Sequence, residues 1–213
     1  MTDDQVEHFF ATLRAANPQP ASELAYSSVF ELLVAVVLSA QATDAGVNRA
    51  TPRLFHDAGT PARMLALGVA GLEPYIRTIG LYRSKARNLI ATCERLLRDH
   101  RGEVPRSREA LEALPGVGRK TANVVLNVAF GEPTFAVDTH VFRVANRTGL
   151  APGRTPRAVE DGLQQRVPEP YRADAHHWLI LHGRYVCLAR RPRCAECAVR
   201  VDCDSPVVAD AGG

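Results

Sequence analysis

Apolar residues recur at helical spacing along most of the chain. No stretch alternates apolar and polar residues for long enough to form a half-buried strand. Val6, Phe9, Phe10 and Leu13 form the apolar face of a first amphipathic helix, which the prolines within residues 17–20 end. The pattern therefore predicts a nearly all-helical protein.

Capping residues and helix breakers predict where the other helices begin and end. Ser28 and Glu31 are spaced for a capping box at the start of an apolar helix, and Thr60-Pro61 opens a short helix that Gly68 closes. Pro52 interrupts a helical pattern, so we expect a kink or a helix start there. Further helices are expected at about 84–100, 107–114, 119–130 and 175–185, and from Asp138 and Thr155 onward, whereas residues 207–213 show no element.

Charge and hydropathy limit the class of protein only loosely. A net charge of +3 and a pI near 8.7 permit a nucleic-acid partner without requiring one. Five arginines against a single acid between Arg184 and Arg200 indicate a local basic face. The start is acidic, and the longest apolar run, residues 30–38, is too short to span a bilayer. We therefore expect a soluble cytoplasmic protein.

Four of the five cysteines lie within the last 27 residues, with the spacing Cys-x6-Cys-x2-Cys-x5-Cys. They are Cys187, Cys194, Cys197 and Cys203. Such clustering in a cysteine-poor chain without a signal segment favours a metal site over disulfides. Four thiolates suit zinc and a four-iron cluster equally. Cys93 stands alone in a helical segment and is expected in the core.

Leu114-Pro115-Gly116-Val117-Gly118 predicts a tight turn between two helices, followed by Arg119 and Lys120. Backbone amides at the start of the second helix can bind a phosphate without reading a base, and Arg119 adds charge to that contact. A helix N-terminus and a neighbouring cation both disfavour the protonated form of Lys120, as an amine nucleophile requires. An ordinary glycine turn beside a solvated lysine remains the alternative.

Asp138 lies at the start of a further helix, where an N-cap role is sufficient to explain it. A capping carboxylate can have a second role. It can stabilise the oxocarbenium-like sugar cation that forms as a base departs, or assist proton transfers around Lys120.

Residues 114–130 followed by 136–149 resemble the helix-hairpin-helix and Gly/Pro-Asp signature of the DNA glycosylase superfamily, in particular endonuclease III. The resemblance implies that Lys120 is a Schiff-base nucleophile and Asp138 its essential partner. It also implies that the four clustered cysteines hold one structural 4Fe-4S cluster. The loop between the first two cysteines would then present three phosphate contacts, Arg190, Arg191 and Arg193.

The same resemblance implies how a nucleotide is reached. Gln41 and Leu81 correspond to elements that fill the gap left by a flipped nucleotide. The alternatives are a polar residue at a helix end and a loop leucine packed on the core. His140, Thr121 and Asn123 flank the proposed catalytic pair and are expected to line its pocket. His176, His177 and His182 lack a metal-ligand pattern, so we expect core or surface positions.

By resemblance the fold is all-α, with two helical domains and a DNA cleft between them. Residues 22–132 would form a six-helix barrel carrying the hairpin 114–120, and residues 1–21 with 133–213 an iron-sulfur domain with its cluster loop at 187–203. The implied function is a monomeric DNA glycosylase and AP lyase, acting on duplex DNA that contains oxidised pyrimidines or abasic sites. Two alternatives remain: a monofunctional relative such as the adenine glycosylase, which usually lacks the lysine, and a non-catalytic DNA-binding module.

Overall fold

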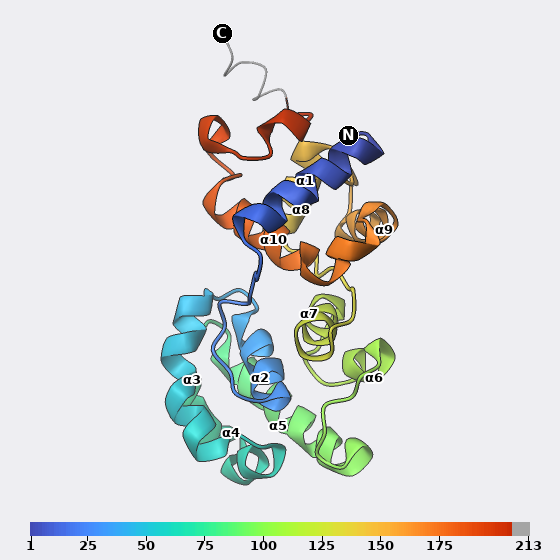
Figure 1. The fold of residues 1–213 in the computed structure, drawn as a ribbon. Helices are drawn as coiled ribbons and strands as arrows, with labels where there is room; N and C mark the ends of the chain where they lie inside the picture. Colours follow the sequence, from blue (N-terminus) through green and yellow to red (C-terminus); the bar gives the residue numbers. More distant parts are fainter. Residues whose placement is uncertain (206–213) are drawn as a thin grey trace. The chain divides into compact units, whose positions relative to one another are not determined.

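The computed structural model describes residues 1–205, and within them all regular secondary structure is helical, as the periodicity predicts (Figure 1). The expectation for residues 207–213 lies outside the described residues. None of the described helices combines the length and apolar character needed to cross a membrane. The chain divides into two compact units, residues 22–131 and residues 1–21 with 132–213.

The unit of residues 22–131 is built around α2, which is apolar on every side. Its helices are α2 (Val29–Ser39), α3 (Asp44–Ala58), α4 (Pro61–Ile76), α5 (Tyr82–His100), α6 (Arg108–Glu112) and α7 (Arg119–Phe130). Residues 30–38 of α2 are all buried. A helix without a polar face must be covered all round, and α3, α5 and α7 pack against it (Figure 1).

The start of α2 differs from the predicted capping box. The Ser28 hydroxyl accepts the amide of Glu31 at 3.1 Å, as expected of an N-cap. The Glu31 carboxylate does not return to the Ser28 amide. It accepts the backbone amide and the hydroxyl of Ser27, each at 2.6 Å, because Ser27 offers two donors to one oxygen. The box is therefore only half formed.

Two helix breakers act differently from each other. Gly68 has φ 65° and ψ 177°, so the helical segment from Pro61 ends there as predicted, but a second segment to Ile76 follows at once. A helix start at Pro52 is wrong. The start of α3 lies at Asp44, where the Thr43 hydroxyl accepts the amide of Gly46 at 3.1 Å, and the helix runs on through Pro52.

The second unit joins the N-terminal helix to the C-terminal part of the chain. Its elements are α1 (Asp3–Ala16), α8 (Thr139–Thr148), α9 (Pro156–Arg166), η1 (Glu169–Tyr171), α10 (Arg172–Tyr185), η2 (Cys194–Glu196) and η3 (Arg200–Asp202). Phe10 of α1 stacks on Tyr171 at 5.7 Å between ring centroids and meets Trp178 at 6.3 Å. The Trp178 indole also donates to the carbonyl of Asn17 at 2.8 Å. This aromatic cluster fixes α1 to residues far away in the sequence.

Candidate functional site

The hairpin between α6 and α7 is a tight turn anchored by its apolar residues. Leu114 and Val117 are buried, and the Val117 amide donates to the Leu114 carbonyl at 3.1 Å. Gly116 between them has φ 76°, a left-handed conformation that favours glycine. The apolar side chains therefore point into the core, and the exposed backbone of Gly116 and Gly118 forms the outer edge of the turn.

One face of α5 supports this turn. The Thr92 hydroxyl donates to the Pro115 carbonyl at 2.9 Å, and a guanidinium nitrogen of Arg95 donates to the Ala113 carbonyl at 2.6 Å. A Cβ atom placed on Gly116 would lie 2.8 Å from the amide nitrogen of Asn88. Asn88, Thr92 and Arg95 follow one another at helical spacing, so they form a continuous support for the turn.

The two glycines of the hairpin should respond differently to substitution by alanine. In Gly116→Ala the new methyl group meets Asn88 in a left-handed backbone, so we expect a loss of about 1–3 kcal/mol in the free energy of unfolding. Gly118 has φ −93° and nothing within 4 Å of its Cβ position. Alanine is a poorer N-cap than glycine but restricts the unfolded chain, and these two effects offset each other, so Gly118→Ala should unfold close to the native midpoint in urea. Equal destabilisation of both variants would contradict this account of the turn.

Helix α7 begins without a side-chain cap, because its N-cap residue is Gly118. Its first intrahelical bond runs from the Ala122 amide to the Gly118 carbonyl at 2.9 Å. As at any helix start, the first-turn amides have no acceptor within the helix, and the helix dipole adds positive potential at the same place. This end of α7 is suited to an anion.

Lys120 lies in that first turn with an exposed side chain. The chain has only two lysines among its 26 lysine and arginine residues, Lys85 and Lys120. Lys85 is 5% exposed. Because an arginine stays protonated in proteins, Lys120 is the one exposed side-chain amine among residues 1–205 that can act as a nucleophile.

Asp138 is the N-cap of α8, as the sequence predicts. One of its carboxylate oxygens, Oδ1, accepts the amides of His140 and Val141, both at 2.8 Å. The side chain is half-buried. Two hydrogen bonds from backbone amides to one oxygen hold the carboxylate in a single orientation at the start of the helix.

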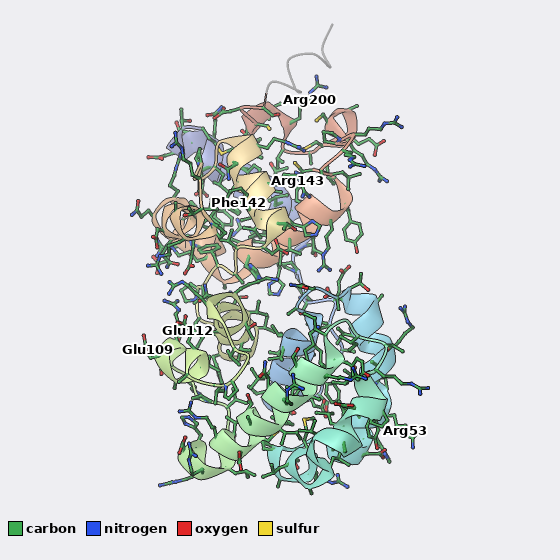
Figure 2. The ribbon with its side chains drawn as sticks, turned by 180° about the vertical axis from the view of Figure 1, so that it is seen from behind. Arg53, Glu109, Glu112, Phe142, Arg143 and Arg200 are labelled. Carbon is green, nitrogen blue, oxygen red and sulfur yellow. The ribbon has the colours of Figure 1, made fainter. Side chains whose placement is uncertain are left out.

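Further along α8, Arg143 (labelled in Figure 2) and Arg147 hold the segment that carries the first cysteine. Arg143 donates to the carbonyls of Cys187 at 2.9 Å and Gly183 at 2.7 Å. Arg147 donates to the carbonyl of Leu188 at 2.7 Å. His140 is half-buried, with its Nδ1 atom 3.2 Å from Arg143. The helix that begins at Asp138 therefore also positions the cysteine segment.

The four clustered cysteines line one pocket and form no disulfide. Burial raises the pKa of Cys197 and Cys203, and the neighbouring thiols raise it further. Four adjacent thiolates are thus unfavourable without a cation, which is the behaviour of a metal-ligand set. Residues 1–205 contain no group of three His, Cys, Asp or Glu side chains already converged on one point. The number and type of donors fit a metal centre, but zinc and iron are not distinguished by them.

His182 lines the same pocket, with its Nε2 atom 3.8 Å from the Cys197 sulfur. It is 7% exposed, and burial lowers its pKa to about 4. The sequence left core and surface positions open for His182; the structure buries it, and its position against the cysteines is not readable from spacing alone.

The other expected residues fall into exposed and buried groups. Leu81 is 61% exposed, so it is not a core leucine. Gln41 is also exposed and lies beyond the end of α2. Asn123 is buried and accepts a hydrogen bond from Arg108 at 3.0 Å, so it joins α6 to α7. It was expected to line a pocket, but it does not face open space. Cys93 is in the core as predicted, and burial raises its pKa to about 12. The three arginines of the cysteine loop, Arg190, Arg191 and Arg193, are exposed.

Comparison with known proteins adds the family. Residues 34–169 match the model of the HhH-GPD superfamily of base excision DNA repair proteins. Endonuclease III of Escherichia coli strain K12 is 62% identical over 192 residues, which cover 90% of this chain and 91% of that protein. The chain belongs to the endonuclease III family.

Other members of the endonuclease III family agree with this placement. The Treponema pallidum protein is 58% identical over 93% of this chain and 94% of its own. A solved structure of a trapped endonuclease III–DNA covalent intermediate superposes with a TM-score of 0.89 at 45% identity, covering 96% of both chains. A thermostable thymine-DNA glycosylase has the same fold at 23% identity, with a TM-score of 0.84 over 94% and 96% of the two chains.

Proposed function

We propose that this protein is a base-excision repair DNA glycosylase with AP-lyase activity, which removes oxidised pyrimidines from duplex DNA. The observation that carries the proposal is the placement of Lys120. Its amine is exposed, whereas the other exposed basic side chains with a fixed charge are arginines. It lies on the first turn of α7, which follows the hairpin and has no side-chain cap. Membership of the endonuclease III family, and its trapped covalent intermediate with DNA, support the same activity.

The hairpin would hold the DNA strand by a phosphate. The first-turn amides of α7 supply donors and positive potential, and Gly116, Val117, Gly118 and Arg119 form the contact. Since Gly118 has open space at its Cβ position, a phosphate can approach the backbone closely there. In this proposal Gly118→Ala weakens DNA binding although the protein remains as stable as the native form.

Lys120 would then attack the sugar. The lone pair of its amine forms a bond to C1′ while the bond from C1′ to the base breaks, and the base leaves with that electron pair and takes up a proton. Opening of the sugar ring produces a protonated imine, which acidifies the C2′ proton. Loss of this proton expels the 3′ phosphate, and water hydrolyses the imine to restore Lys120. Asp138 would stabilise the positive charge on the sugar during the first step.

Flipping a nucleotide leaves a gap in the base stack, and Gln41 and Leu81 would fill it. Leu81 exposes most of an apolar side chain at the start of α5, which suits a wedge between bases. Gln41 carries an amide that can pair with the base left without a partner. Neither side chain is needed to hold the core.

The four cysteines Cys187, Cys194, Cys197 and Cys203 would hold one 4Fe-4S cluster. When bound, the cluster supplies a rigid cross-link and no step of the reaction. Arg143 and Arg147 hold the carbonyls of residues 187 and 188, and the exposed Arg190, Arg191 and Arg193 would contact phosphates beyond them.

Iron analysis tests this part separately. A sample prepared without oxygen should contain about four iron atoms per chain and show broad visible absorbance. Cys197→Ser should lose both, whereas Cys93→Ser, in the other unit and away from the pocket, should keep both. Zinc in place of iron in the native sample would refute the cluster.

A reductive trapping experiment tests the activity. The protein is incubated with a duplex containing one thymine glycol, and borohydride is added to reduce any imine. We expect a covalent protein–DNA adduct and, without borohydride, a strand break 3′ to the lesion. Base release without an adduct would favour a monofunctional glycosylase. Binding without base release would favour a non-catalytic DNA-binding module.

The relatives of this chain come from bacteria. The proposed function places the protein in the cytoplasm of such a cell, as a monomer acting on the nucleoid. In the same proposal Lys120 and Asp138 act on one nucleotide.

A further inference from the structure

Gln41 and Leu81 share an unusual backbone conformation. Gln41 has φ 57° and Leu81 has φ 60°, both in the left-handed region that residues with a Cβ atom rarely adopt. Such conformations persist only where the surrounding structure holds them in place. Gln41 follows the end of α2, and Leu81 is the N-cap of α5. Both residues are exposed and come from separate parts of the chain, so each conformation needs support from the residues around it.

Lys85 contacts the backbone of Leu81 and of Ala40, the residue before Gln41. Its amide donates to the carbonyl of Leu81 at 3.0 Å, within the first turn of α5. Its ammonium donates to the carbonyls of Leu38 at 2.8 Å and Ala40 at 2.6 Å, immediately before Gln41. These carbonyls lie at the C-terminal end of α2, where the helix dipole favours a cation. One residue therefore ties the end of α2 to the start of α5.

Gly80 lets the two turns lie close to each other, because it has no side chain between them. The carbonyl oxygen of Gln41 lies 3.8 Å from the Cβ position of Gly80, the residue before Leu81. The Ser84 hydroxyl adds a bond to the Leu81 carbonyl at 2.9 Å. The turns at 40–42 and 80–82 are thus held close to each other, and the Lys85 side chain bonds to the carbonyl of Ala40 in the first of them.

The choice of lysine at this place is costly for stability. Lys85 is 5% exposed, and burial lowers its pKa because it disfavours the charged form. Only the bonds to carbonyls offset this effect. An apolar side chain of the same length would avoid the cost of burying a charge, but it would take this donor away from the two carbonyls. Arginine, which supplies almost every other cation in the chain, has a planar fork that does not match two carbonyls converging on one point. The compact ammonium can bond to both carbonyls at once, which indicates that Lys85 serves to fix the position of the backbone at the end of α2.

We propose that Lys85 is a positioning residue, which holds Gln41 and Leu81 in register so that both enter the DNA stack together. This inference rests on the proposed glycosylase function and adds a residue to it. Turns that are already fixed do not have to become ordered when their side chains enter the gap. The gain in rate is therefore expected only on duplex DNA, where there is a gap to fill. Lys85 itself is buried and touches no DNA.

The test compares duplex and single-stranded DNA carrying an abasic site, with borohydride trapping as the rate measurement. Lys85→Met should slow trapping on the duplex about tenfold, the worth of a charged hydrogen bond, and leave the single strand unchanged. Should Lys85→Met not fold, Lys85→Gln keeps a donor and is measured in its place. Thr51→Val removes another buried bond to a carbonyl in the same unit and serves as the control for lost stability.

A combined variant isolates the route of the effect. In the background Gln41→Ala with Leu81→Ala, Lys85→Met should cause no further loss on the duplex, because the side chains that it positions are gone. An additive loss, or equal slowing on single-stranded DNA, would overturn the inference and leave the glycosylase proposal standing. If the native protein forms no adduct on either DNA, the proposed function itself fails.

Discussion

Lys120→Ala is expected to abolish the borohydride adduct and the strand break, with a loss of at least about a thousandfold in rate. The variant lacks the amine that would bond to C1′, and no arginine can replace it because guanidinium groups stay protonated. The exposed position of Lys120 means that alanine leaves no cavity. Unfolding in urea should therefore match the native protein, which separates lost chemistry from lost folding.

The site of attachment can be read directly. Proteolysis of the native adduct should place the DNA on a peptide containing Lys120. The other lysine, Lys85, is buried and bonded to two carbonyls, so a peptide containing Lys85 should carry no DNA. An adduct that survives in Lys120→Ala would move the nucleophile elsewhere.

Asp138→Asn should slow base release by about a hundredfold or more while the protein keeps its stability. Asparagine caps a helix nearly as well as aspartate, so the bonds from the amides of His140 and Val141 remain possible. Only the negative charge is lost. Base release is measured under single-turnover conditions on the thymine glycol duplex, apart from strand cleavage.

Asp138→Ala provides the matched comparison for the cap. It should show the same slow base release and in addition lose about 1 kcal/mol in the free energy of unfolding, because two helix amides lose their acceptor. If Asp138→Asn releases the base at the native rate, the carboxylate is a cap alone. The catalytic role would then be withdrawn, although the assignment of α8 would stand.

The capping and packing signals near the site were mostly readable in advance. Ser107, Thr155 and Asp138 cap their helices as the sequence predicts. The expected helix at 84–100 begins earlier, at Tyr82, because the strained Leu81 acts as its N-cap without offering a side-chain bond. A left-handed leucine has no sequence signature, so this boundary was not predictable.

Lys85 shows a signal that spacing arguments overlooked. It lies on the buried face of α5, where a helical pattern predicts an apolar residue, and its partners are carbonyls of α2. Backbone carbonyls are present at every position, so no residue type marks them as partners. The scarcity of lysine in this chain could have drawn attention to it, but only the contact reveals its role.

The amino-acid sequence by itself determined the all-helical class, the tight turn at Gly116, most of the caps and the clustered cysteines, because each depends on residues close together in the chain. The tertiary structure decided what lies against them. It placed α5 under the hairpin, Arg143 and Arg147 on the cysteine segment, and Lys85 between two strained turns. These are hydrogen bonds to backbone carbonyls tens of residues away, and such acceptors become specific only when folding brings one of them within reach.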